Sequence, residues 1–257
     1  MTKFRTRYRA ALPALLLTLS LAAVTGCARR RVAAYIPPAP TSTSAPAYGS
    51  FPSQPAYQQK PLAGLTADQQ YVESHRPIYT QVGIASWYGP LYNHHRAADG
   101  RVYHQNQLSA AHRTLPLGSI VKVTNLRTGQ SAVMPITDRG PFVPGRIIDL
   151  SAAAAHAVGL YRAGIGEVRV SVYYSPEPLD YGGSWAVQIG AFRSKRAALR
   201  LEHRLQNEYR SASVIEFRGP TGDWVRIRPY DGNRQIALQI VHTVRPKQGA
   251  AFLVRLD

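Results

Sequence analysis

Between residues 81 and 173, the side chains that could act as proton donors are four carboxylates: Asp99, Asp138, Asp149 and Glu167. A carboxylic acid can protonate a leaving group and take the proton back when apolar or like-charged surroundings raise its pKa. Asp138 could instead pair with Arg139 or accept backbone N–H bonds, which would lower its pKa. We interpret Asp149 as a helix-start carboxylate, because it stands just before the expected N-cap Ser151. Glu167 opens a strand and is expected to be solvated.

Histidines supply the other candidate groups. His94, His95 and His104 form a local cluster, but no suitably spaced acid or cysteine lies nearby, so we expect no metal. Nothing in the sequence indicates a cofactor. His112 could orient a substrate or carry a proton. The alternative for His112 is a histidine that makes only structural hydrogen bonds.

The elements that must position these groups are mostly short strands. Residues 120–125 alternate with period 2, a turn is expected at 128–129, and 168–172 alternate again. A single helix is expected at 152–158. Many short strands joined by glycine and proline turns predict a small β-barrel over 81–173.

Residues 184–257 follow a different pattern: strand, helix, strand, strand, helix, strand. Apolar residues recur at helical spacing in both helices, including Leu201 and Leu205 in the first and Ile240 and Val244 in the second. This order predicts a ferredoxin-like sandwich, with two helices on one face of a four-stranded sheet.

The N-terminus predicts export. Basic residues precede an apolar run at 10–24, which is shorter than the roughly 20 residues that a membrane span needs. A short retained anchor is the alternative to a cleaved signal. Residues 28–80 are rich in Pro, Ser, Ala and Gln without sustained periodicity, and predict an extended tether.

Composition limits the partners. The 257-residue chain has one cysteine, Cys27, so it cannot form an intramolecular disulfide. Its formal net charge of +17 favours a polyanionic partner, for which nucleic acid is the usual first candidate. An exported protein has little chance to meet DNA, so we expect no nucleic-acid partner. Anionic envelope polymers or lipid headgroups fit the charge instead.

Four segments closely resemble the rare lipoprotein A (RlpA) family, and they occur in the family's order: 83–89, 108–118, 138–142 and 145–151. Their sequences are Gly-Ile-Ala-Ser-Trp-Tyr-Gly, Leu-Ser-Ala-Ala-His-Arg-Thr-Leu-Pro-Leu-Gly, Asp-Arg-Gly-Pro-Phe and Gly-Arg-Ile-Ile-Asp-Leu-Ser. Residues 185–192 and 224–227 resemble a SPOR domain. The ending Val-Thr-Gly-Cys at 24–27 resembles a bacterial lipobox, in which Cys27 is acylated.

The resemblance implies a mainly β plus α+β fold, namely a six-stranded double-psi β-barrel followed by a ferredoxin-like SPOR domain. The expected parts are a lipoprotein signal, a tether, the barrel, a linker and the SPOR domain, with boundaries 1–27, 28–80, 81–173, 174–183 and 184–257.

The family implies an endolytic lytic transglycosylase that acts on peptidoglycan. Such an enzyme protonates the leaving oxygen, and the sugar's own 6-hydroxyl then closes onto the anomeric carbon without water. The resemblance places His112 and Asp138 in the cleft, and Trp87, Tyr88 and Arg139 among the substrate-binding residues.

One departure from the family bears on catalysis. The family usually has a glutamate directly after the glycine of its Ala-x-Gly segment and an aspartate three residues later. Arg101 and His104 stand there. Arginine stays protonated and cannot act as the acid. Asp138 is the first replacement candidate, and Asp99 is the second because it lies two residues from the lost position.

The SPOR-like region has a predicted binding face. Strand alternation places Val225 and Ile227 on one side of the sheet. The other side would carry a possible sugar platform with hydrogen-bond donors: Gln188, Trp224, Arg226 and Arg228. The alternative is a basic, solvated sheet face. By resemblance, this face binds glycan strands that lack stem peptides.

Taken together, these features predict an outer-membrane lipoprotein that faces the periplasm and is enriched at the division septum. Its expected partners are peptidoglycan glycan strands, the outer membrane through lipid on Cys27, and divisome proteins. Two alternatives use the same architecture. One is a septal lipoprotein that binds glycan without cutting it, which Arg101 and His104 favour, and the other is an expansin-like barrel that loosens the wall.

Overall fold

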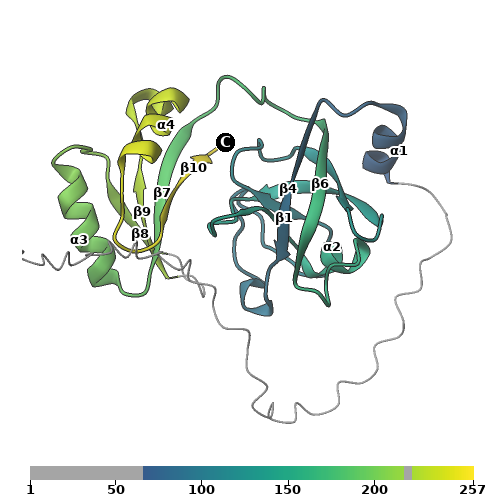
Figure 1. Cartoon of the computed structure of the whole chain (residues 1–257). Helices are drawn as coiled ribbons and strands as arrows, with labels where there is room; N and C mark the ends of the chain where they lie inside the picture. Colours follow the sequence, from purple (N-terminus) through teal and green to yellow (C-terminus); the bar gives the residue numbers. More distant parts are fainter. Residues whose placement is uncertain (1–65, 217–221) are drawn as a thin grey trace, which may run out of the picture. The chain divides into compact units, whose positions relative to one another are not determined.

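A closed six-stranded barrel forms the first folded domain (Figure 1). This computed structural model describes residues 66–216 and 222–257, which belong to one compact unit. Around the barrel the strands run β1-β5-β2-β4-β3-β6. The pairs β1–β5 and β2–β4 are parallel, and the others are antiparallel. The strands are β1 (Tyr79–Trp87), β2 (Ala110–His112), β3 (Ile120–Asn125), β4 (Ser131–Asp138), β5 (Arg146–Leu150) and β6 (Ile165–Tyr174).

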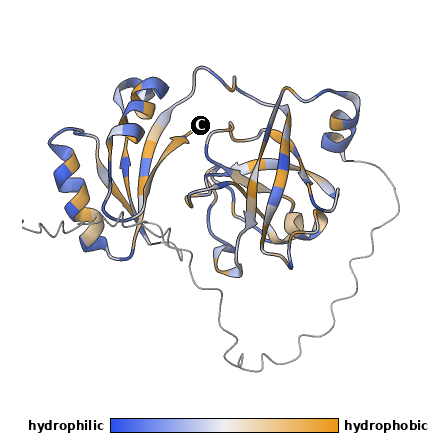
Figure 2. Cartoon of the chain, in the orientation of Figure 1, coloured by the Kyte–Doolittle hydropathy of each residue, from blue (hydrophilic) through white to orange (hydrophobic). Residues whose placement is uncertain are grey.

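Period-2 alternation builds the barrel core. Along β3, Val121 and Val123 are fully buried between partly exposed neighbours. Met134 and Ile136 of β4 and Ile148 of β5 are also buried in the same cluster. Figure 2 shows the matching alternation of hydrophobic and hydrophilic residues along the barrel strands. The predicted barrel is therefore confirmed, with two short strands, β2 and β5, that the alternation pattern did not indicate.

Two short helices pack against the barrel strands. The predicted helix is α2 (Ala152–Ala157), and the Ser151 hydroxyl caps it by accepting from the Ala154 N–H at 3.0 Å. A short 3-10 turn, η1 (Pro90–Tyr92), follows β1. Part of the predicted tether is folded: α1 (Ala67–Ser74) has a Thr66 capping box and buries Val72. Residues 67–74 therefore differ from the extended tether predicted for 28–80, because the capping box at Thr66 starts a helix there.

The second domain is a four-stranded antiparallel sheet in the order β10-β7-β9-β8, with two helices. Its elements follow the predicted strand–helix–strand–strand–helix–strand order, with one added 3-10 turn. They are β7 (Trp185–Phe192), α3 (Lys195–Gln206), β8 (Ser213–Glu216), β9 (Asp223–Ile227), η2 (Tyr230–Gly232), α4 (Arg234–Thr243) and β10 (Ala250–Arg255). Val225 and Ile227 pack with Leu201 of α3 and Ile240 of α4 in one core. The predicted ferredoxin-like arrangement is confirmed.

Most of the predictions for the N-terminal region concern residues that the structure does not describe. The predicted signal (1–27), the acylated Cys27 and the tether up to residue 65 lie beyond the described residues. Within the described residues, no helix has the length and apolar character required to cross a membrane.

Removing the α2 cap should weaken the barrel. Ser151 is fully buried, and its hydroxyl accepts from the Ala154 N–H and, at 3.4 Å, from the Ser109 N–H. We expect Ser151→Ala to lower the free energy of unfolding by about 1–3 kcal/mol, because buried N–H groups lose their acceptor. Urea unfolding measures the change. Ser131→Ala, at an exposed strand start, is the control; equal effects of the two substitutions would contradict the assignment.

Candidate active site

The two central aspartates lie in one row across four neighbouring strands. Asp138 of β4 and Asp149 of β5 both pair with Ala111 of β2, which lies between them. Ser86 of β1 pairs with Asp149 on the other side. The register shifts beside Ala85 and Ala111, at both parallel pairings, and such irregularities often re-aim side chains at active sites. The barrel therefore brings Asp138 and Asp149 to two positions of one face, separated by a small residue.

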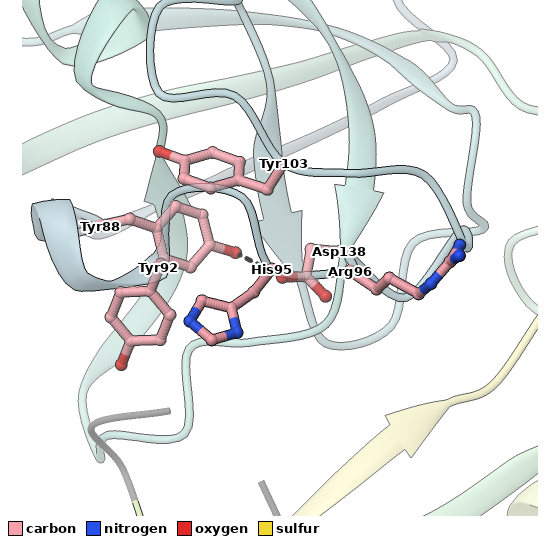
Figure 3. Close-up of a pocket in the computed structure, with 6 residues that line it drawn as sticks. All are labelled: Tyr88, Tyr92, His95, Arg96, Tyr103 and Asp138. Carbon is pink, nitrogen blue, oxygen red and sulfur yellow. Dashed lines mark hydrogen bonds between the residues drawn. The ribbon is translucent and has the colours of Figure 1, made fainter. Parts of the chain in front are cut away.

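Asp138 lies at a tyrosine-lined hollow (Figure 3). The Tyr88 hydroxyl donates to Asp138 Oδ2 at 3.3 Å, as the dashed line in Figure 3 marks. The N–H groups of Ala98 and Arg139 donate to Oδ1 at 2.9 and 2.8 Å. Burial raises the pKa of Asp138, while these three donors oppose the shift. The predicted backbone hydrogen bonds to Asp138 are therefore present, but burial outweighs them.

Asp149 borders a larger cavity of about 250 Å³, beside Ser86 and Arg146. Trp224 of the second domain also borders this cavity, within the same compact unit. Asp149 is a strand residue of β5, so its interpretation as a helix-start carboxylate was wrong. Burial raises the pKa of Asp149, while Ser86, Arg146 and Arg113 oppose the shift. The structure thus adds a second half-buried carboxyl to the site.

Aromatic rings at and just after the end of β1, those of Trp87 and Tyr88, line the cavities. Tyr88 borders both hollows, and Trp87 borders the larger one, where its ring stacks on Tyr161 with centroids 4.4 Å apart. Burial, followed by the charges of Asp138 and Asp149, raises the pKa of Tyr88 well above its usual value. Tyr88 therefore stays neutral and can donate its hydroxyl proton to a hydrogen bond.

His112 is placed among backbone groups and borders neither cavity. Its Nδ1 accepts from the N–H groups of Thr114 and Leu115, at 3.2 and 3.0 Å, and its Nε2 lies 3.1 Å from Gln81 Oε1. Burial, with Arg113 and Arg139 nearby, lowers the pKa of His112 to about 3. Both ring nitrogens have partners, so these contacts match the structural alternative for this residue.

Arg139 also bonds to backbone rather than lining a cavity. Its Nη1 donates to the carbonyl oxygens of His112 and Leu115, at 3.1 and 2.6 Å. Burial is the main cause of a pKa lowered to about 10. These bonds hold the segment after β2 in place, next to the strand that carries Asp138.

Asp99 and Arg101 form an ion pair, with 2.7 Å between Oδ2 and Nε, and the backbone N–H of Arg101 donates to the same carboxylate. Asp99 borders neither cavity described above. The His94 and His104 rings lie 5.7 Å apart, whereas His95 lines the tyrosine hollow. Among residues 66–216 and 222–257, no group of three or more His, Cys, Asp or Glu side chains is placed to hold a metal ion.

The predicted sugar platform on the second sheet is only partly open. Arg226 Nη2 donates to Gln188 Oε1 at 2.8 Å, so these two residues do share a face. Trp224 packs with Phe252 and Val254 on that face and is only 4% exposed. Gln188 is buried, whereas Arg228 is exposed. Alternation predicted the face correctly, but it could not predict how much of the face is covered.

Sequence reasoning missed two polar residues of the larger cavity. Arg146 Nη1 donates to Ser86 Oγ at 2.8 Å, and Ser86 Oγ donates to Asp149 Oδ1. Both residues lie within segments that resemble the family, but β5 was not recognised as a strand. The parallel pairing of β1 with β5 is a long-range contact, and local periodicity carries no signal for it.

Comparison with known proteins divides the chain in the same way. Residues 80–170 match the family described as "Lytic transglycolase", and residues 181–255 match the SPOR domain. Proteins named "Endolytic peptidoglycan transglycosylase RlpA" are among the relatives. The Pasteurella multocida protein is 52% identical over 94 residues, covering 37% of this chain and 32% of the relative. The Vibrio cholerae protein is 47% identical over 100 residues, covering 39% and 38%.

A third relative matches over more of both chains. The Campylobacter jejuni protein of the same name is 37% identical over 160 residues, covering 53% of this chain and 58% of the relative. The chain therefore spans less than two thirds of each of these relatives. A solved Clavibacter michiganensis expansin covers 46% of this chain and 59% of its own, at 19% identity and a TM-score of 0.32, which supports no inference.

The buried His112 should make folding sensitive to acid. The pKa of His112 is lowered from 6.5 to about 3, so the unfolded chain binds a proton that the folded chain excludes. Its contribution to stability is complete above pH 6.5 and is lost as pH falls towards 3. We expect wild type to lose more unfolding free energy between pH 7 and pH 4.5 than His112→Gln, whose side chain does not titrate. Urea titrations test this; parallel losses would contradict it.

Proposed function

Because the chain belongs to the rare lipoprotein A (RlpA) family, we propose that it is an endolytic lytic transglycosylase that cleaves peptidoglycan glycan strands poor in stem peptides. The main supporting observation is the pair of half-buried aspartates, Asp138 and Asp149, on strands that flank β2. Burial raises the pKa of each, which is the condition under which a carboxyl can donate a proton near neutral pH. The relatives are named as endolytic peptidoglycan transglycosylases, which supports this proposed reaction.

The reaction needs one proton donor and a surface that holds the sugar. The donor protonates the glycosidic oxygen, and O6 of the same sugar attacks the anomeric carbon to form a 1,6-anhydro ring. Trp87 and Tyr88 supply aromatic planes and a neutral hydroxyl at the cavity wall. Polar groups around the carboxyls would support charge on the sugar as the bond breaks.

The substitution at Arg101 does not remove every candidate acid from the site. The Asp99–Arg101 ion pair lies away from both cavities, whereas Asp138 and Asp149 border them. If one of these two aspartates supplies the proton for cleavage of the glycosidic bond, the reaction does not require a glutamate at position 101. The enzyme is therefore favoured over a lipoprotein that binds glycan without cutting it.

The second domain would hold the enzyme on its substrate. We propose that the SPOR domain binds glycan strands without stem peptides and concentrates the protein at the division septum. On the sheet face opposite the helices, the buried Gln188 accepts from Arg226 Nη2 and so positions the partly exposed Arg226, whose guanidinium a sugar chain could reach. Acylation of Cys27 would anchor the chain to the outer membrane, facing the periplasm, and place it near divisome proteins.

Replacement of Asp138 tests the reaction. Incubation of the purified chain with sacculi should release fragments with 1,6-anhydro sugar ends, detected by mass spectrometry. Asp138→Asn should lower that rate at least about 100-fold, the usual scale for a lost acid–base or charge-stabilising group. Binding to pelleted sacculi should be unchanged. Glu167→Gln, an exposed carboxylate on β6, is the matched control. Wild-type binding without anhydro ends would reject the enzyme.

Replacement of Arg226 tests the binding face. Arg226→Gln removes a guanidinium that bonds to Gln188, and it should weaken pull-down by peptide-free glycan strands roughly 10-fold or more. Arg200→Gln on α3 is the control, because it removes the same charge from an exposed helix position. Equal losses in the two variants would indicate nonspecific attraction by positive charge.

A further inference from the structure

Part of the positive charge of the chain lies in a row on one helix of the second domain. In α3, arginines recur every four residues, at Arg196, Arg200 and Arg204, and all three are exposed. Positions i, i+4 and i+8 lie on one side of an α-helix, about 6 Å apart along its axis for each step. The three residues therefore form a single row on the helix surface, which we call the arginine stripe.

The opposite side of α3 is fixed in the core of the second domain. Ala198 is fully buried and Leu201 is buried, and both belong to the cluster that contains the sheet residues Val225 and Ile227. Leu205 packs against the same cluster. Because this apolar side is held by the sheet, the arginine stripe stays on the outer surface of the domain.

The arginine stripe has no acidic partner in the part of the chain that the structure describes. The ion pairs formed within residues 66–216 and 222–257 include none of its three arginines. Glu202 is the one carboxylate of α3, and its Oε1 accepts from Gln206 Nε2 at 3.4 Å. Like charges four residues apart destabilise a helix. The stripe therefore opposes the stability of α3, and the contacts within the domain give no reason for it.

An apolar side chain accompanies the arginine stripe. Leu199 is 44% exposed, whereas Ala198 and Leu201 on either side of it in the sequence are buried. It lies three residues after Arg196 and directly before Arg200, so helical spacing places it at the edge of the stripe. Figure 2 shows hydrophobic residues between the hydrophilic ones along α3. The outer side of the helix thus combines positive charge with an exposed apolar group.

We propose that the arginine stripe, with Leu199 at its edge, is a docking surface for a membrane that exposes anionic phospholipid headgroups. Guanidinium groups donate paired hydrogen bonds to phosphate oxygens. A cluster of basic residues is attracted to an anionic leaflet, and an apolar side chain that enters the headgroup layer adds to that attraction. Leu199 favours a lipid surface over a flexible anionic polymer of the wall, because a hydrated polymer offers no apolar layer for it.

The docking surface goes beyond the proposed reaction, because it lies on the other side of the domain from the proposed glycan face. Arg226 and Gln188 share the sheet face opposite the helices, whereas α3 covers the face that carries Val225 and Ile227. Figure 1 shows α3 and α4 beside the four-stranded sheet. One small domain would then contact a lipid surface through its helix side while its sheet side holds a glycan strand.

Vesicle co-sedimentation tests the arginine stripe. The chain from residue 28 onward contains every described residue and lacks Cys27, so no acyl group contributes to binding. It should bind vesicles of equal parts phosphatidylglycerol and phosphatidylcholine, bind phosphatidylcholine vesicles weakly, and lose affinity for the anionic vesicles as salt rises. Replacing the three stripe arginines together by glutamine should weaken binding to the anionic vesicles about 10-fold or more. Circular dichroism and pull-down by sacculi should stay unchanged.

A matched control removes the same charge from the barrel. The control variant carries glutamine at three exposed arginines of that domain: Arg127, Arg162 and Arg169. It should bind the anionic vesicles like wild type. Equal losses in the two triple variants would show attraction by total charge and overturn the docking surface. Equal binding of wild type to both kinds of vesicle would overturn it as well.

A second variant separates a lipid partner from a wall polymer. Leu199→Gln leaves the charge in place and should weaken binding to the anionic vesicles several-fold, because the apolar contact is lost. Its pull-down by sacculi should stay unchanged. A stripe variant that loses binding to sacculi but keeps its binding to vesicles would make the stripe a contact for wall polymer and overturn the lipid proposal. None of these measurements depends on cleavage, so a failure here leaves the proposed transglycosylase untouched.

Discussion

The site depends on how the barrel closes. Parallel pairing of β1 with β5 and of β2 with β4 brings Ser86, Asp149 and Asp138 into one row, although 63 residues separate the first two. Burial at these positions disfavours charged carboxyls and raises their pKa values. The same closure supplies the opposing groups: backbone N–H donors to Asp138, and the Ser86 hydroxyl to Asp149. The order in which the strands pair therefore decides which groups surround the two aspartates, and these groups set the direction of their pKa shifts.

The half-buried Arg113 and Arg139 and the buried His112 support that arrangement, and none of the three borders either cavity. Arg139 and Arg113 bond to carbonyl groups of the segments after β2 and around β5. His112 accepts two backbone N–H bonds and stays neutral because burial lowers its pKa to about 3. These residues fix the loops from which the cleft is built. Their location within family-like motifs is thus consistent with a positioning role.

Sequence predicted the fold well where patterns are local. Alternation indicated β3 and β6, helical spacing indicated α3 and α4, and Ser151 indicated the cap of α2. Strands β2 and β5 are short and depend on long-range parallel pairing, which explains the misreading of Asp149 as a helix-start residue. Chain order also could not reveal that Trp224 is covered. Burial and partner choice are set by tertiary contacts.

The most direct measurement of the central claim is the protonation state of Asp138 and Asp149. Carbon-13 NMR of the labelled chain, with Asp138→Asn and Asp149→Asn used to assign the signals, would follow the two side-chain carboxyls through a pH titration. The account predicts that each remains protonated above the pH range of an ordinary aspartate, because burial outweighs the donors and charges that oppose it. Ionisation of either carboxyl in the ordinary aspartate range, or below it, would contradict the account.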